Sequence, residues 1–122
     1  MSVSFQALID HLDTTGTVTI ATRRADGEER TTPIWSVAVG DQPYVRSAYG
    51  PDSWWYKRAI ARGAAFLVDG EWMPVRAQYV DDDATIAAVD AAYSTKYARQ
   101  RASLQSVLTA EARACTLRLV PT

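Results

Sequence analysis

Arginines and hydroxyl residues gather near the ends of expected strands in the first half of the chain. They are Arg23 and Arg24 before a turn, Arg30, Thr31 and Thr32 after it, and Arg46 with Ser47 further along. Guanidinium groups and hydroxyl donors are the usual means of binding a phosphate in proteins. The pattern therefore indicates a local site for a phosphate-bearing or otherwise anionic ligand.

The segment GPDSWWYKRAIARG, residues 50–63, adds aromatic rings and a helix start to this set. Asp52 or Ser53 is a suitable N-cap, and the free amides of the first turn favour an anion there. Lys57, Arg58 and Arg62 are expected on other faces of this helix. Three tryptophans are available to flank a flat ring: Trp35, Trp54 and Trp55.

A structural interpretation of the same residues remains open. Arg23, Arg24 and Arg30 are close in sequence to three carboxylates, with which they would pair in a solvated hairpin: Asp26, Glu28 and Glu29. Such exposed pairs contribute little to stability and bind no ligand. In this interpretation the tryptophans belong to the hydrophobic core.

Other kinds of catalytic site find little support. His11 is the only histidine, and it lies on an expected surface helix, so a Ser-His-Asp site is not expected. The acidic run Asp81–Asp83 is more typical of a helix cap than of a calcium site. The glycine patterns of dinucleotide and P-loop sites are missing. If the chain is an enzyme, a bound cofactor must supply the reactivity.

Composition limits the class of protein further. A chain of 122 residues is expected to form a single domain over residues 1–122. The net charge of −1 offers no extended basic field, so we expect no nucleic-acid partner. Cys115 is the only cysteine, and no apolar run is long enough for a membrane helix. These features favour a soluble cytoplasmic protein.

The periodicity predicts six strands and several helices. An amphipathic helix is expected over residues 3–13, packed across an open barrel end. The expected strands cover residues 18–23, 30–39, 43–49, 64–69, 71–80 and 115–121. Helices are expected from Ser53 to Gly63 and over 81–99, and residues 103–112 form a shorter helix or a mobile segment. Short turns favour antiparallel pairing, which predicts a mixed β-barrel interrupted by helices.

Two motifs resemble the deazaflavin-dependent nitroreductase family. ATRRADGEERTTPIW is similar to that family's Thr-x-Arg-x-x-Gly-x-x-Arg-Thr-Thr-Pro stretch, and GPDSWWYKRAIARG is similar to its Pro-x-Trp-Tyr-x-Asn-Leu helix start. The resemblance covers residues 17–121, although Arg58 replaces the family's asparagine and the amino-terminal part is short. The group includes flavin reductases and pyridoxamine-phosphate-oxidase-like enzymes, and a small subfamily of uncharacterised split-barrel proteins is more similar still.

The resemblance implies a fold and a set of ligand contacts. The fold is a split β-barrel, an antiparallel six-stranded barrel with an inserted helix and carboxyl-terminal helices. The implied cofactor-binding residues form two groups. Arg23, Arg24, Arg30, Thr31 and Thr32 line the phosphate region, and Arg46, Ser47, Trp55 and Lys57 lie near the phosphate or the ring.

The resemblance also implies an activity. The cofactor is a deazaflavin coenzyme or FMN, and the protein is an oxidoreductase that passes hydride from the reduced cofactor to a small quinone-like or nitro-compound-like acceptor. The alternative is a non-catalytic module that binds a flavin-like, haem-like or other anionic ligand. Split barrels of this length commonly complete their cofactor cleft with a second subunit, which implies a homodimer.

Overall fold

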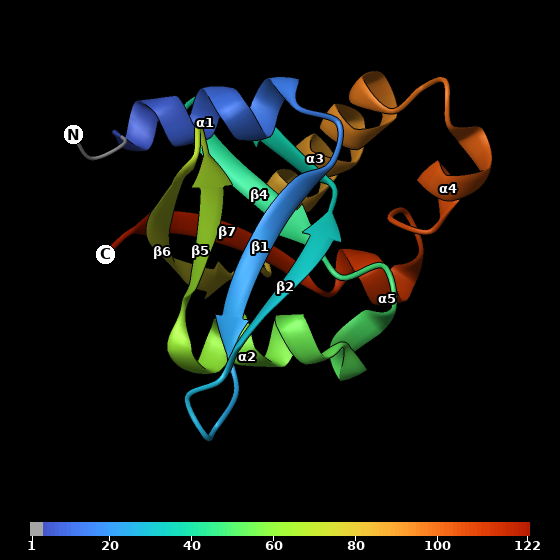
Figure 1. Cartoon of the computed structure of the whole chain (residues 1–122). Coiled ribbons are helices and arrows are strands. Elements are labelled where there is room, and N and C mark those ends of the chain that lie inside the picture. Colours follow the sequence, from blue (N-terminus) through green and yellow to red (C-terminus); the bar gives the residue numbers. More distant parts are fainter. Residues whose placement is uncertain (1–3) are drawn as a thin grey trace.

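A single curled antiparallel sheet organises the chain in the computed structural model, which describes residues 4–122. Its strand order is β2-β1-β5-β6-β7-β4-β3. The strands are β1 (Val18–Arg23), β2 (Glu29–Ile34), β3 (Ser36–Val39), β4 (Gln42–Arg46), β5 (Ala64–Val68), β6 (Glu71–Tyr79) and β7 (Thr116–Pro121). The expectation of an antiparallel barrel interrupted by helices is confirmed (Figure 1).

The sheet has seven strands where six were expected, because the strand expected over residues 30–39 is broken at Trp35. The strands on either side of this residue, β2 and β3, are the two edges of the sheet. Since one residue joins the two edges, the sheet must curl until they meet. Because of the break, the expected three-strand meander becomes two hairpins, β1–β2 and β3–β4, at opposite edges of the sheet.

The two helices for which caps were predicted begin close to those positions, after Ser53 and Asp82. The helices are α1 (Phe5–Thr14), the 3₁₀ turn η1 (Gly50–Asp52), α2 (Trp54–Arg62), α3 (Asp83–Lys96), α4 (Arg101–Gln105) and α5 (Ala110–Arg113). Ser4 caps α1 and Asp82 caps α3, each by accepting a bond from an amide of the first turn. The start expected for the first helix at residue 3 lies outside the described residues. The segment left open as a helix or a mobile stretch, residues 103–112, overlaps α4 and α5.

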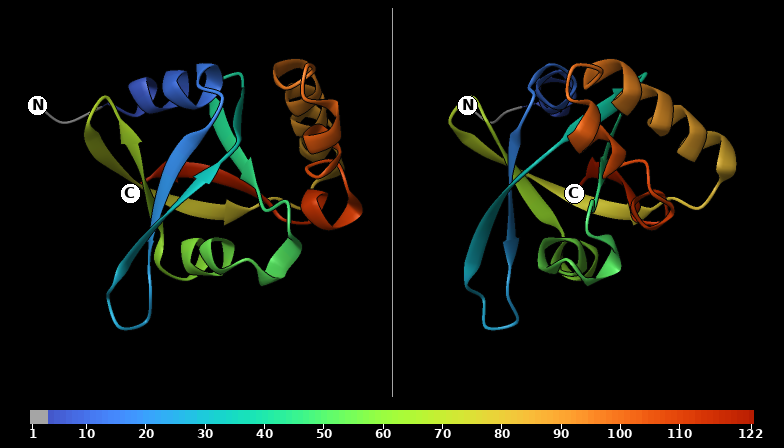
Figure 2. Two further views of the ribbon diagram at one scale, coloured as in Figure 1. Left: turned by 45° about the vertical axis from the view of Figure 1, so that its right-hand side comes forward. Right: turned by 90° about the vertical axis from the view of Figure 1, so that its right-hand side faces the viewer.

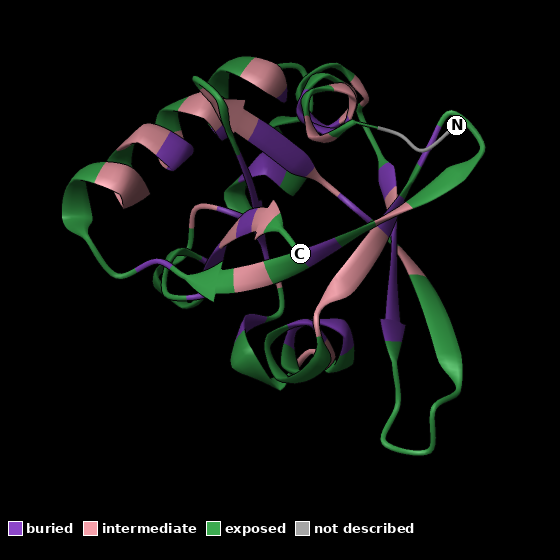
Figure 3. Ribbon diagram, turned by 90° about the vertical axis from the view of Figure 1, so that its left-hand side faces the viewer, coloured by how far each residue is buried: buried purple, intermediate pink, exposed green. Residues whose placement is uncertain are grey.

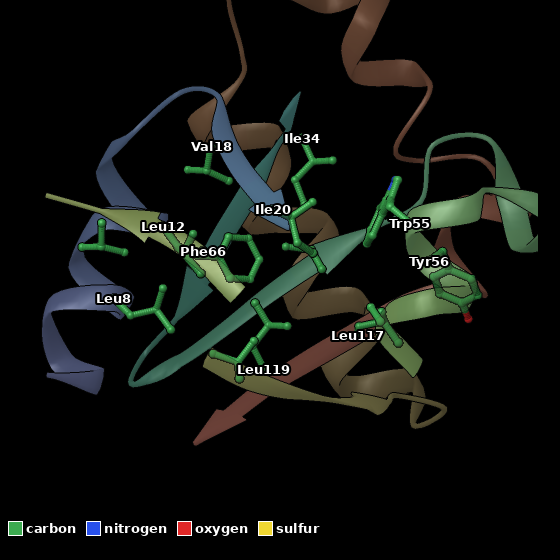
Figure 4. Packing of buried hydrophobic residues seen from close by; sticks show 14 of the residues in the cluster. Leu8, Leu12, Val18, Ile20, Ile34, Trp55, Tyr56, Phe66, Leu117 and Leu119 are labelled. Carbon is green, nitrogen blue, oxygen red and sulfur yellow. The ribbon is translucent and has the colours of Figure 1, made fainter. Parts of the chain in front are cut away.

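Two helices close the two ends of the barrel, and their apolar faces complete its core (Figure 1). Leu8 and Leu12 of α1 enter the core at one end, as the spacing of the apolar residues predicted. Trp55 and Tyr56 of α2 enter it at the other (Figure 4). The strands fill the space between with fully buried side chains such as Phe66. Burial of this apolar surface is the main force that holds the barrel together.

A second core lies outside the barrel, between α3 and the β3–β4 hairpin. Val89, Tyr93 and Tyr97 of α3 share one buried stripe at helical spacing, as expected from the sequence. Leu104 and Val107 extend this cluster into the segment around α4. The second core therefore places α4 beside the junction of β2 and β3.

The β1–β2 hairpin projects past α2 and carries an exposed tip (Figures 2 and 3). Residues 23–31 are all exposed. By contrast, the β5–β6 turn is tight: Asp69 and Gly70 have φ values of 50° and 80°, as a type I′ turn requires. No helix among residues 4–122 is long and apolar enough to cross a membrane.

Candidate functional site

A cleft of about 530 Å³ lies where the β2–β3 junction, the β4–α2 connection and the α4 segment meet. We call it the tryptophan cleft. Its lining residues are Thr32, Pro33, Ile34, Trp35, Arg46, Ala48, Tyr49, Ser53, Trp54, Trp55, Arg58, Ser103, Ser106 and Val107. The volume is in the range of small-molecule sites.

Three tryptophans from two separate segments line this cleft. Trp35 is half-buried at the break between β2 and β3, where its ring stacks on Tyr97 at 3.8 Å and 4°. Trp55 is only 7% exposed and belongs to the barrel core, whereas Trp54 is 68% exposed. The core interpretation therefore fits Trp55, while Trp35 and Trp54 offer aromatic surface to a ligand.

The start of α2 faces the same cleft. Ser53 is the N-cap, but its side chain makes no capping hydrogen bond, so the hydroxyl keeps its bonding capacity. The first amides of a helix have no partner within the helix, and the helix dipole places partial positive charge there. A ligand oxygen in the cleft would meet the Ser53 hydroxyl and these amides together.

A second hollow of about 620 Å³, the basic groove, adjoins the cleft between α2 and the tip of the β1–β2 hairpin. It is lined by Arg24, Ala25, Trp54, Lys57, Arg58, Ala61 and Arg62. The Lys57 ammonium lies 5.1 Å and the Arg58 guanidinium 5.5 Å from the centre of the Trp54 ring. Trp54 and Arg58 line both hollows, so the aromatic cleft and the positively charged groove adjoin at these two side chains.

The hairpin arginines are partly paired, as the structural interpretation expected. Arg24 and Arg30 both lie close to Glu28, at 3.5 and 3.2 Å. All three side chains are about half exposed, so these pairs are weak and exchange readily with a ligand anion. Lys57 is similarly half exposed and lies 3.8 Å from Asp52. Arg24 and Lys57 thus face the basic groove with only weak competing partners.

Arg46 is buried and bonded to the protein on several sides. Its Nη1 donates to Asp90 at 2.6 Å and to the Val107 carbonyl at 3.0 Å, and its Nε donates to Thr116. Its Nη2 also donates to the carbonyl of Ile86. These bonds tie β4 to α3 and β7, so Arg46 builds one wall of the cleft.

The other expected site residues are spread around this region. Thr32 lines the tryptophan cleft, and Thr31 is exposed on β2. Ser47 is fully buried, and its hydroxyl donates to the Gly50 carbonyl at 2.6 Å, which shapes the turn before α2. Arg23 lies apart from both hollows, on the outer face of the sheet. Contact of these residues with a cofactor stays a prediction.

Several lining residues were not among the residues expected from the sequence. Arg58 was expected on another face of α2, yet it lies beside Trp54, four residues earlier on the helix. Tyr49 is 87% exposed at the cleft. Ser103 and Ser106 come from the α4 segment, whose position depends on packing with distant residues. The helical spacing of Trp54 and Arg58 was the one local signal for any of them.

The lining of the cleft limits its chemistry. Among the described residues that line it there is no carboxylate, histidine, cysteine or lysine, so it has no evident general base. It offers aromatic surfaces, the Arg58 guanidinium and several hydroxyls. This donor set fits an anionic ligand with a flat ring that carries its own reactivity, such as a flavin-type cofactor. No group of three or more metal-binding side chains occurs among residues 4–122.

The curled sheet with an end-capping helix at α2 is that of the split-barrel proteins. The chain belongs to the family described as "Uncharacterized protein conserved in bacteria (DUF2255)", whose model matches residues 8–119. A comparison with curated proteins found no match.

Solved structures with the same fold include three proteins from mycobacteria. The FAD and heme binding protein of Mycobacterium smegmatis is 25% identical, with a TM-score of 0.61. That alignment covers 97% of this chain and 65% of the other, so this chain spans less than two thirds of that protein. The FAD binding protein of M. smegmatis is 21% identical, with a TM-score of 0.59 and coverage of 100% and 90%. A conserved hypothetical protein of M. tuberculosis is 13% identical, with a TM-score of 0.64 and coverage of 98% and 79%.

Proposed function

We propose that the chain, as one split-barrel domain over residues 1–122, binds a flavin-type cofactor in the tryptophan cleft. The observation that carries the proposal is that the aromatic cleft and the basic groove adjoin, since Trp54 and Arg58 line both. A flavin-type cofactor joins a flat ring to an anionic tail, and the two hollows match these two parts. The similarity to a protein that binds FAD and heme supports the same class of ligand.

The ring belongs in the cleft, between Trp35 and Trp54. Trp35 is held by its stacking on Tyr97, so it is a rigid surface on which a second ring packs without loss of side-chain freedom. The anionic tail runs past Ser53 towards Arg58, Lys57 and Arg24. The deazaflavin coenzyme, with its longer acidic tail, and FMN are the two forms proposed, and the four cationic side chains of the basic groove favour the first.

The proposed activity is transfer of hydride from the reduced cofactor to a small quinone or nitro compound. A reduced flavin or deazaflavin ring supplies the hydride when bound. The protein then needs only to orient the ring and the acceptor and to keep water away, which agrees with a lining that lacks a general base. Tyr49 is the side chain in the cleft from which a product could take a proton. We further propose that the protein is a homodimer in the cytoplasm and that its partners are the cofactor and this small acceptor.

Binding is tested by titrating FMN, FAD and the deazaflavin coenzyme while tryptophan fluorescence is recorded. Lys57→Ala should weaken binding by about 1 to 3 kcal/mol, the range for a charge-assisted hydrogen bond, without loss of fold. Trp54→Ala should also weaken binding and leave the fold intact, because this side chain is mostly exposed. Trp55→Ala should instead destabilise the fold by about 3 to 5 kcal/mol, because Trp55 is buried.

Arg99→Ala is the matched control for the lost charge, because Arg99 is exposed and lies outside both hollows. Unchanged affinity in both Lys57→Ala and Trp54→Ala would contradict the proposed site. Oxidation of the bound reduced cofactor by an added quinone or nitro compound tests the enzyme separately. Tight binding without such turnover would leave the alternative, a module that binds a cofactor without catalysis.

A further inference from the structure

A third hollow, of about 530 Å³, lies on the outer face of the sheet, away from the tryptophan cleft. We call it the outer-face hollow. Ala21 of β1, Ala65 of β5 and Pro74 of β6 are neighbours across the three strands, so they form one row. Ile20, Phe66 and Val75, next to them in the chain, point into the barrel core. Because side chains alternate along a strand, the row of small residues faces outward and forms the floor of the hollow.

Arg23, Gly63 and Arg76 also line the hollow. Arg23 is two residues from Ala21 on β1, and Arg76 is two residues from Pro74 on β6, so both side chains share the outer face with the row of small residues. Since β5 lies between β1 and β6, the two arginines flank the start of β5, where Gly63 joins it to α2.

The glycine at this junction is required by the backbone. Gly63 has φ 77° and ψ −173°, and a Cβ at this position would lie 2.9 Å from the Val75 carbonyl oxygen. Only glycine adopts this conformation readily. The backbone path at the α2–β5 junction is thus fixed, and Arg62, the preceding residue, lines the hollow from the helix.

The charges around the hollow are predominantly positive. Arg23, Arg62 and Arg76 line it, and none of them takes part in the ion pairs of the described residues. Glu29 is the one carboxylate side chain in the lining, and Thr122 completes the wall. Free guanidinium groups that face a shared space bind carboxylates and phosphates in a bidentate manner.

An aromatic wall stands beside the floor. Trp72 lies two residues before Pro74 on β6, so it shares the outer face, and it remains 45% exposed. Its indole and the floor of small side chains offer apolar contact to a ligand body of limited thickness. The hollow shares Arg62 with the basic groove, but no lining residue with the tryptophan cleft.

We propose that the outer-face hollow binds a second ligand, a carboxylate or phosphate attached to a small flat ring. The anionic group lies over Gly63 between Arg23 and Arg76, and the ring lies on the floor of small residues against Trp72. This site is independent of the cofactor cleft, because the two hollows open at different parts of the barrel and have separate linings.

The test is an amide NMR titration of the whole chain with phenyl phosphate, benzoate and inorganic phosphate. The two ring compounds should shift the amides of residues 62–65 and of Arg76, independently of any shift that they cause at residues 53–55. Phenyl phosphate should bind more tightly than inorganic phosphate, because only the former contacts Trp72. Shifts confined to the tryptophan cleft or the basic groove would overturn the proposal.

Variants distinguish specific binding in the outer-face hollow from nonspecific attraction of anions to a positively charged surface. The double variant Arg23→Gln, Arg76→Gln should bind phenyl phosphate about tenfold more weakly or worse. The double variant Arg99→Gln, Arg101→Gln removes the same charge elsewhere and should bind as the parent does. Equal weakening in both would overturn the site. Trp72→Leu should reduce the affinity for phenyl phosphate to that for inorganic phosphate. If the ratio of these two affinities is the same as in the parent, the ligand ring does not contact Trp72.

All four arginines are exposed, so these variants should keep the fold, which the NMR spectrum itself reports. A titration repeated at saturating FMN distinguishes this site from the proposed cofactor site. The shifts that phenyl phosphate causes at residues 62–65 and at Arg76 should be unaffected by FMN, whereas their loss at saturating FMN would overturn the separate site.

Discussion

Two buried tyrosines of α3 show how neighbouring side chains of one type differ in what they contribute. The Tyr97 hydroxyl accepts a bond from the Ser36 amide at 3.1 Å and donates to the Gly16 carbonyl at 2.7 Å. The Tyr93 hydroxyl is fully buried and has no hydrogen-bond partner among the described residues. The Tyr97 hydroxyl therefore joins distant segments of the chain. The Tyr93 hydroxyl is a buried polar group with no hydrogen bond to offset the cost of its burial.

The same substitution should have opposite effects at these two positions. Tyr97→Phe should lower the free energy of unfolding by about 1 to 3 kcal/mol, because it leaves the buried Ser36 amide without its partner. Tyr93→Phe should be neutral or stabilising by about 1 kcal/mol, because it removes an unsatisfied group. Denaturant unfolding of both variants measures the difference, and equal destabilisation would contradict the assigned bonds.

The ammonium of Lys96 is also held inside, where it donates to the carbonyls of Leu12 and Ser36 at 2.8 and 2.7 Å. Burial lowers its pKa from 10.5 to about 8, an effect that the charge of Asp13 opposes. Between these two values the unfolded chain keeps a proton that the folded chain has released. The free energy of unfolding therefore gains a contribution from Lys96 that rises with pH over this range.

The variant Lys96→Met lacks this titration and isolates the contribution. Relative to the variant, the parent should become more stable as the pH rises from about 8 towards 10, as measured by denaturant unfolding at several pH values. Groups that titrate in both proteins cancel in the comparison. A difference between the two proteins that is constant over this range would show that Lys96 keeps its ordinary pKa.

At the scale of elements, the junction of α2 and β5 depends on one residue. Gly63 ends the helix in a conformation that only glycine adopts readily, and β6 passes so close that the Val75 carbonyl occupies the space of a Cβ. The junction sets the angle at which α2 crosses the end of the barrel. It also places Trp55 in the core and Trp54 at the cleft.

Gly63→Ala should therefore destabilise the fold by about 2 to 4 kcal/mol, the combined effect of backbone strain and the close contact with Val75. Gly16→Ala is the matched control, because no atom lies near the added Cβ and its φ lies outside the left-handed region. The control should change the stability by less than about 1 kcal/mol. Thermal unfolding of the pair measures both effects, and equal stability would show that the junction relaxes without cost.

At the scale of the whole molecule, the tryptophan cleft is lined by two mostly exposed aromatic side chains, Tyr49 and Trp54. A chain of this size often completes such a surface with a second copy. We expect a homodimer of about twice the chain mass of 13.4 kDa in light scattering at micromolar concentration. The cofactor should then bind with its ring shielded by both subunits. A clean monomer under these conditions would remove the shared cleft.

Sequence alone determined the features that depend on neighbours in the chain. The ends of β1, the Asp69–Gly70 turn and the span of α2 followed from local signals, because turn geometry and helix caps are set within a few residues. The resemblance of two short motifs gave the split barrel. It also implied Trp55 and Lys57 as site residues, and the structure places them in the linings of two adjoining hollows.

The tertiary structure alone decided how these local elements meet. The continuous apolar pattern across Trp35 gives no sign of a break, since both β2 and β3 keep strand geometry and only the closure of the barrel separates them. Nothing in the local sequence distinguishes Arg46 from the other arginines, because its burial depends on contacts with α3 and β7. Ser103 lies at the cleft because the second core holds the α4 segment there. The burial of side chains, the closure of the barrel and the pairing of charged groups depend on contacts between residues far apart in the chain. These contacts exist only once the sheet has curled.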